Sequence, residues 1–310
     1  MTLALPIGLP ARRRLERERI PLLAQGAFDR QAAQRVGEEP LRILMINLMP
    51  AKVVAETQIA RLLGHTDAAI ELTLAIPDGY RPKTTPPDHI AAFYRPWSAL
   101  RHNRYDGLIV TGAPIETLPF EEVSYWPQLT QVLDWAERNV ARAYMICWAG
   151  QAALYHYHGV PKHELDGKMF GVYRQQVTTP GSPLMDGIGD SFVVPVSRHT
   201  EVRAEELPAG AGLRVLAQSP ESGVCLIEDS RRGFLYMFNH LEYDAGTLAL
   251  EYKRDVTAGL QITLPKGYFP KDDPAKPPRN RWRRHANRFF SNWIADMRRA
   301  RRPKVVATAP

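Results

Sequence analysis

The sequence predicts an α/β fold in which helices cover both faces of a mostly parallel sheet. From residue 42 onward, short and continuously apolar runs alternate with longer amphipathic stretches. Strands buried on both faces have such runs, and their alternation with helices is typical of a parallel sheet with crossover connections. Three of the runs end in glycine-rich or chemically reactive residues, as expected where the carboxyl ends of parallel strands form a ligand-binding edge.

The alternating pattern assigns the elements in chain order. Strands are expected at residues 42–49, 69–76, 105–114, 141–147, 191–197, 213–219, 223–229 and 232–239. Helices are expected at residues 51–65, 125–140, 148–159 and 244–260. Pro127 falls in the first turn of its helix, where proline is tolerated. Gly159 and Pro161 stop the helix that begins at residue 148.

We expect a single domain, because no internal repeat and no long Gly/Ser linker divides residues 1–310. Residues 1–38 have weak periodicity and are expected to form an N-terminal arm. Residues 39–263 form the predicted α/β core, and residues 264–310 form a proline-rich crossing and a C-terminal amphipathic helix. The apolar residues of that helix recur at helical spacing: Trp282, Ala286, Phe289, Phe290, Trp293, Ile294 and Met297.

The C-terminal helix also carries many arginines, and the whole chain has a formal net charge of +7. We interpret the arginines as the solvated face of a helix packed on the core, which is the usual role of a charge run. The alternative is a patch for an anionic ligand such as coenzyme A, or for an acidic partner. No nucleic-acid-binding motif accompanies the charge, so no nucleic-acid partner is expected.

Composition narrows the cellular context. No apolar run reaches the length of a membrane span, and the N-terminus lacks the order of a secretory signal. A cytoplasmic protein without a membrane partner is expected.

The two cysteines form no metal-binding pattern, and His156 and His158 point to different faces of their helix, so no metal is expected. Cys225 lies within an apolar run and is interpreted as inert core.

The stretch "MICWAGQAALYHYHG" places Cys147 at a junction between strand and helix. A free thiol is only slightly ionised at neutral pH, so a nucleophilic cysteine needs a base, and the base needs an orienting acceptor. His240 and Glu242 follow a late strand, where alternation would put both side chains on one face. The three residues form a plausible nucleophile, base and orienting acid.

An oxyanion hole is also predicted beside this cysteine. The N–H group of Trp148 opens the helix after the cysteine, and Gly112 and Ala113 lie in the turn after another strand. Backbone N–H groups from the two segments could converge on a developing oxyanion. The glycine allows the backbone to approach closely.

These residues carry two nested resemblances. The order "DGLIVTGAP", "ICWAGQ" and "HLE" resembles the class I glutamine amidotransferase superfamily, which has a flavodoxin-like α/β fold. The chain from about residue 40 to residue 293 resembles more closely the homoserine O-acyltransferase family of methionine biosynthesis (the MetA type). The matching segments are long and unusual: "LMINLMPAKVVAETQ", "CWAGQAALYHYHGVPK", "KMFGVYRQ", "SRHTEV", "NHLEYDAGTLALEYKRD" and "YFPKDDP".

The resemblance implies a ping-pong reaction with an acyl-CoA and L-homoserine as substrates, no permanently bound cofactor, and a homodimer. It implies that Cys147 is acylated, that His240 is the base and that Glu242 orients it. Lys52 matches a family lysine near the acyl and cofactor site. The positions that match the family's amino-acid-binding residues are Lys168, Ser197 and Arg254.

The same resemblance selects the acyl group through Glu116, in "TGAPIETLPF". At this position, users of acetyl-CoA carry glutamate and users of succinyl-CoA carry glycine. A glutamate would repel the distal carboxylate of a succinyl chain, so homoserine O-acetyltransfer is expected and O-succinyltransfer is the alternative. Two further hypotheses depart from the acyltransferase family. One is a glutamine amidase that uses the same triad, and the other is a non-catalytic protein that binds anions. Serine as the acceptor also stays open.

Overall fold

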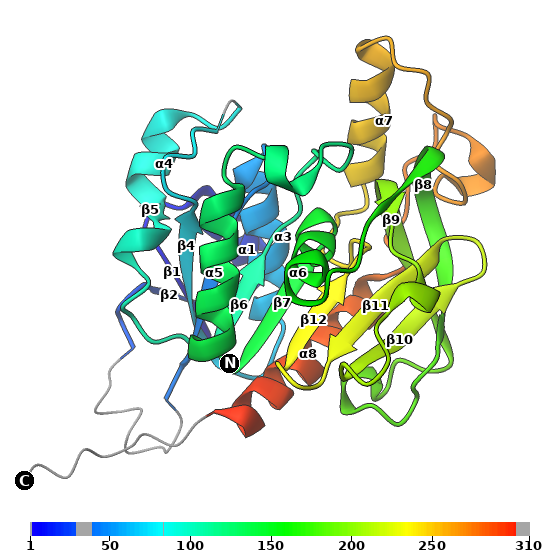
Figure 1. Ribbon diagram of the computed structural model, residues 1–310. Helices are drawn as coiled ribbons and strands as arrows, with labels where there is room; N and C mark the ends of the chain where they lie inside the picture. Colours follow the sequence, from blue (N-terminus) through cyan, green and yellow to red (C-terminus); the bar gives the residue numbers. More distant parts are fainter. Residues whose placement is uncertain (1, 29–38, 83, 302–310) are drawn as a thin grey trace, which may run out of the picture.

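The computed structural model describes residues 2–28, 39–82 and 84–301. Within these residues, one mixed sheet runs in the order β2-β1-β4-β3-β6-β7-β12-β11-β10-β8-β9 (Figure 1). Its first seven strands are parallel to their neighbours. They are β2 (Leu22–Ala24), β1 (Thr2–Leu5), β4 (Ala69–Ile76), β3 (Leu41–Ile46), β6 (Gly107–Val110), β7 (Arg142–Ile146) and β12 (Phe234–Met237). The predicted α/β fold is confirmed.

The rest of the sheet is antiparallel. It consists of β11 (Gly223–Asp229), β10 (Leu213–Ser219), β8 (His163–Val177) and β9 (Ser191–Glu201). Sequence analysis missed β8, because its charged residues conceal the alternation of a half-buried strand. A register shift between Glu164 and Met169 interrupts that alternation further. It also missed the short strand β5 (Arg95–Pro96), which pairs with β4, and the helix α4 (Pro87–Phe93).

Helices cover both faces of the sheet, as predicted. Along β3, Ile43 and Met45 pack in one apolar cluster, and Leu44 and Ile46 pack in the other. The first cluster is covered by α1 (Pro10–Arg17), α3 (Lys52–Gly64) and α8 (Arg283–Ala300). The second is covered by α5 (Trp126–Asn139) and α6 (Trp148–His158). No helix of the described residues is long and apolar enough to cross a membrane.

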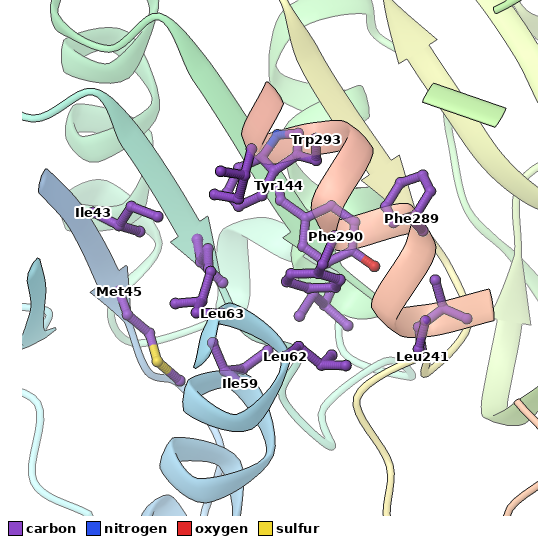
Figure 2. Packing of buried hydrophobic residues seen from close by; sticks show 14 of the residues in the cluster. Ile43, Met45, Ile59, Leu62, Leu63, Tyr144, Leu241, Phe289, Phe290 and Trp293 are labelled. Carbon is purple, nitrogen blue, oxygen red and sulfur yellow. The ribbon is translucent and has the colours of Figure 1, made fainter. Parts of the chain in front are cut away.

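The predicted C-terminal amphipathic helix is present as α8. Phe289, Phe290 and Trp293 pack around Tyr144 of β7 (Figure 2). Several arginines on its outer side form ion pairs, for example Arg298 with Asp67 at 3.4 Å. A solvated face with ion pairs is what we expected of a C-terminal helix packed on the core. These ion pairs do not favour the alternative, a patch that binds an anionic ligand.

The N-terminal segment is more than an arm, since β1 and β2 extend the sheet and α1 packs on α3. Leu15 of α1 is fully buried in the core cluster. Arg61 of α3 is only 3% exposed, and its guanidinium contacts Glu18 at 2.6 Å and Asp244 at 2.5 Å. The segment therefore joins the core through both apolar and ionic contacts. Residues 29–38 of the predicted arm lie outside the described residues.

Replacing Leu15 with alanine tests whether the N-terminal segment is part of the folded core. We expect Leu15→Ala to lower the free energy of unfolding by about 2–5 kcal/mol, because it removes a fully buried side chain and leaves a cavity. Urea denaturation measures the change. Arg13→Ala, on the exposed side of the same helix, is the control. Equal stabilities of the two variants would mean that the segment contributes little to the core.

Candidate active site

Cys147 lies in a strained turn between β7 and α6. Its backbone has φ 53° and ψ −120°, a conformation that L residues rarely adopt and that folded proteins retain mainly at functional sites. Its N–H donates a hydrogen bond of 2.6 Å to the carbonyl oxygen of Met237, the last residue of β12. The side chain is 4% exposed, at the N-terminus of a helix, where negative charge is stabilised.

The pairing of β7 with β12 brings His240 to this cysteine. Ile146 and Met237 are register partners, so the residues after them leave the sheet at the same edge. His240 interacts with the Cys147 side chain, which is one of the causes that raise the pKa of the imidazole. Its Nδ1 atom lies 2.6 Å from Oε1 of Glu242, and both residues are buried. The expectation that strand alternation aligns His240 and Glu242 is wrong, since β12 ends at Met237 and a turn makes the contact.

Opposing effects determine the charge of His240. Burial lowers its pKa, but the negative charges of Glu242 and Cys147 and their hydrogen bonds raise it more, so the pKa lies well above 6.5. The imidazole is therefore protonated at neutral pH. The imidazole thus lies between the carboxylate of Glu242 and the sulfur of Cys147, an arrangement in which cysteine nucleophiles of other proteins are activated.

The predicted oxyanion hole lies directly beside the cysteine. A Cβ atom on Gly112 would lie 3.1 Å from Cβ of Cys147 and 3.8 Å from the backbone nitrogen of Trp148. Only glycine lets the turn after β6 approach the elbow so closely. The N–H of Trp148 is in the first turn of α6, where N–H groups have no acceptor within the helix. It can bind an oxyanion together with an N–H from the turn that contains Ala113.

Lys168, Ser197 and Arg254 come together through two carboxylates on α7 (Thr247–Thr257). The hydroxyl of Ser197 lies 2.5 Å from Glu251, and Nζ of Lys168 lies 3.3 Å from the same carboxylate. The other carboxylate, Asp255, contacts Lys168 at 2.9 Å and Arg254 at 2.6 Å.

The sequence analysis did not single out Glu251 or Asp255. Their spacing of four residues on one helix face, with Arg254 between them, was the available signal. Arg254 is 61% exposed, so its guanidinium is accessible at the mouth of the cluster.

Lys52 is fully buried at the start of α3. Its Nζ atom donates hydrogen bonds to the carbonyl oxygens of Asn47 (2.5 Å) and Met49 (3.2 Å), and it lies 4.9 Å from the ring centre of Tyr80. Burial lowers the pKa of Lys52 to about 7, although the charge of Glu56 opposes the shift. The side chain is therefore not an ordinary solvated lysine at a helix start.

Glu116 is half-buried in the loop after β6. Burial raises its pKa, whereas the positive charges of His199, His240 and Lys168 lower it. These interactions place the carboxylate within electrostatic reach of both the catalytic imidazole and the amino-acid cluster. Lys162 donates hydrogen bonds to the carbonyl oxygens of Glu116 and Leu118, which fixes the loop.

The remaining candidates have ordinary structural surroundings. His156 and His158 are paired with Asp134 at 2.7 Å and Asp229 at 2.8 Å, on different sides of their helix. Cys225 is fully buried, and burial raises the pKa of its thiol to about 12, which makes it unreactive. Within the described ranges, no three His, Cys, Asp or Glu side chains are grouped to hold a metal ion.

The mostly parallel sheet, with a strained cysteine beside a histidine–glutamate pair at one edge, has a fold similar to that of solved glutamine amidotransferases. Solved structures agree on the fold. A glutamine amidotransferase from Thermotoga maritima matches with a TM-score of 0.55 and 14% identity, covering 84% of this chain and 99% of the other. One from Methylobacillus flagellatus matches with a TM-score of 0.51 and 12% identity, over 88% and 99%.

Sequence comparison identifies the family. The family model described as homoserine O-succinyltransferase matches residues 2–301, and the chain belongs to this family. A homoserine O-acetyltransferase from Rhizorhabdus wittichii is 50% identical over 299 residues, which cover 96% of this chain and 92% of that protein. A homoserine O-acetyltransferase from Brucella canis is 48% identical over 297 residues, covering 96% and 95%.

Glu242→Gln tests the charge balance at His240. The variant keeps the size of the side chain but removes the negative charge that raises the pKa of His240. We expect the imidazole to titrate closer to its ordinary value of about 6.5, as measured by nitrogen NMR of labelled histidine. An unchanged midpoint would contradict the assignment.

The raised pKa of His240 also makes the free energy of unfolding depend on pH. Because the folded value exceeds the unfolded one, protonation of His240 stabilises the fold fully below about pH 6.5, and this contribution is lost as pH rises through the folded pKa. The loss of native stability with rising pH should therefore be smaller in Glu242→Gln, as urea titrations across this pH range can measure.

Proposed function

We propose that this protein is a homoserine O-acetyltransferase that works through an acetyl-Cys147 intermediate. The observation that carries the proposal is that Cys147, His240 and Glu242 are linked in one buried chain of contacts. The names of relatives at 48–50% identity over 96% of the chain support the same substrate pair. A cysteine nucleophile, an acyl-CoA donor and an amino-acid acceptor fit together in a two-step transfer.

In the first step, the thiolate of Cys147 attacks the thioester carbonyl of acetyl-CoA. The carbonyl oxygen becomes an oxyanion beside the N–H groups of Trp148 and the Gly112–Ala113 turn. The intermediate collapses by breaking the bond between the acetyl carbon and the sulfur of CoA. The proton on His240 goes to that sulfur, so CoA leaves as a thiol and the imidazole is neutral.

In the second step, the neutral His240 accepts the proton of the homoserine hydroxyl, whose oxygen attacks the acetyl carbon. A second oxyanion forms in the same hole, and its collapse breaks the bond to Cys147. The products are O-acetyl-L-homoserine and the original thiolate–imidazolium pair. Glu242 holds Nδ1 of the ring at 2.6 Å throughout, leaving Nε2 to exchange the proton.

The cluster on α7 has the charges needed to hold an α-amino acid. Arg254 can bind a carboxylate through two parallel hydrogen bonds, and Glu251 can accept hydrogen bonds from an ammonium group. In the structure, Glu251 forms an ion pair with Lys168, and Arg254 forms one with Asp255. Lys168 also pairs with Asp255. A zwitterion offers the same two charges, so it can exchange partners with the cluster without leaving a charge unpaired.

The acetyl donor is favoured over the succinyl donor by Glu116. Two like charges about 4 Å apart repel by about 4 kcal/mol at an effective dielectric constant near 20, nearly a thousandfold in rate. Partial burial of Glu116 makes a second negative charge beside it costly. Succinyl transfer remains the alternative, because the description of the family model names that activity.

We include in the proposal a cytoplasmic location, as the composition suggests, and a homodimer without a permanently bound cofactor, as the resemblance implies. A glutamine amidase with the same triad is the second candidate function, favoured only by the shared fold of the solved amidotransferases. It predicts release of glutamate from glutamine without any CoA ester.

Incubation with acetyl-CoA alone tests the acyl-enzyme. We expect intact-mass spectrometry to show the gain of one acetyl group, and peptide mapping to place it on Cys147. Added L-homoserine should remove the label, whereas L-serine tests the shorter acceptor. Cys147→Ala should remain unlabelled, with Cys225→Ala as the matched control. Labelling of Cys147→Ala to the native extent would contradict the proposal.

Glu116→Gly tests the choice of donor. Removing the carboxylate should raise kcat/KM for succinyl-CoA by about tenfold or more relative to acetyl-CoA, since it removes charge repulsion and opens space. Steady-state rates with both esters measure the ratio. Glu122→Gly, a nearby exposed position, is the control. An unchanged ratio in Glu116→Gly would assign the selectivity to other residues.

A further inference from the structure

Tyr243 lies between the catalytic imidazole and the amino-acid cluster. Its ring is stacked on that of His240, with centroids 4.1 Å apart and planes inclined by 18°. The residue is 4% exposed, and its contact with His240 is face to face. Stacking restricts rotation of the imidazole out of its plane. The single hydrogen bond to Glu242 does not prevent this rotation by itself.

The hydroxyl of Tyr243 is at the other end of the same side chain and interacts with the carboxylate of Glu251. Burial and the negative charge of Glu251 raise the pKa of this hydroxyl well above 10, so it keeps its proton and donates. Glu251 also accepts from Ser197 at 2.5 Å. Ser197 of β9 and Lys168 of β8 donate to this carboxylate, and the Tyr243 hydroxyl interacts with it from the turn after β12.

Hydrogen bonds and ion pairs from other elements hold the backbone of Tyr243 and Asp244 in place. Its carbonyl oxygen accepts hydrogen bonds from Nε1 of Trp282 (2.8 Å) and Nδ2 of Asn280 (3.3 Å). The next residue, Asp244, forms ion pairs with Arg61 at 2.5 Å and Arg283 at 3.0 Å. These contacts come from α3 and from the start of α8, so the position of Tyr243 does not depend on a ligand.

We propose that Tyr243 is a positioning residue with two separable roles. The face of its ring holds His240 in line with Cys147, and its hydroxyl holds Glu251 for the ammonium group of the amino-acid substrate. The first role belongs to both half-reactions, and the second only to the half-reaction with the acceptor. The proposal rests on the function proposed above and adds a residue outside the triad, next to Glu242 in the chain.

The competing explanation is that Tyr243 only fills the apolar cluster that it shares with Phe170, Leu248, Phe269 and Trp282. A purely structural residue would affect both half-reactions equally through stability. The ping-pong scheme allows the two to be measured separately, since acetylation of Cys147 needs no amino acid.

Two variants separate the roles. Tyr243→Phe keeps the ring, so the single-turnover rate of Cys147 acetylation should stay within about twofold of native. Loss of a hydrogen bond to a charged group should raise KM for homoserine by about tenfold or more. Tyr243→Leu removes the stack, so acetylation itself should slow by about tenfold or more, with a shifted pH profile. Phe269→Leu, a truncation in the same cluster away from His240, is the control for packing.

The histidine NMR spectrum provides a readout independent of turnover. The His240 ring protons should lose their ring-current shift in Tyr243→Leu and keep it in Tyr243→Phe. An unchanged KM for homoserine in Tyr243→Phe, or equal slowing of acetylation in Tyr243→Leu and Phe269→Leu, would overturn the proposal. Failure of the native enzyme to become acetylated would instead refute the proposed function, with the ring-current result still testing the stack.

Discussion

The pairing of β7 with β12 is the constraint on which the rest of the site depends. Register partners Ile146 and Met237 end the two strands together, and the N–H of Cys147 donates to the carbonyl oxygen of Met237. One hydrogen bond therefore joins the elbow of the nucleophile to the strand that leads to the base. Residues 93 positions apart in sequence meet because two parallel strands end at the same edge of the sheet. The strained backbone at Cys147 persists since the sheet on one side and α6 on the other fix it.

Charge connects this edge to the amino-acid cluster. The imidazolium of His240 lies among Glu242, the sulfur of Cys147 and, at longer range, Glu116. The cations Lys168 of β8 and Arg254 of α7 are balanced in a similar way by Glu251 and Asp255. Such networks leave few buried charges unpaired and let one anion or cation replace another when a zwitterion binds. Tyr243 contacts both groups, since its ring stacks on His240 and its hydroxyl interacts with Glu251.

The parallel half of the fold could be predicted because each of its strands is a continuous apolar run next to an amphipathic helix. Prediction failed at β8, where charged and polar residues, among them Lys168 of the α7 cluster, conceal the alternation of a half-buried strand. It also failed at residues 2–24, whose strands are too short to recognise in isolation and become part of the sheet when β1 pairs with β4 and β2 pairs with β1. The proposed catalytic residues Cys147 and His240 could be singled out because both follow apolar runs. Glu251, Asp255 and Tyr243 could not, since their roles depend on contacts between α7, β8 and the turn after β12.

Reactivity of Cys147 in a variant without His240 tests most directly whether the two side chains act as one unit. At neutral pH, we predict that iodoacetamide alkylates Cys147 of the native protein at least about tenfold faster than Cys147 of His240→Ala, because the imidazolium stabilises the attacking thiolate. Cys225 should resist alkylation in both and serves as the internal reference. Equal rates at Cys147 would contradict the account, since the thiol would then react without help from the ring that the β7–β12 pairing places beside it.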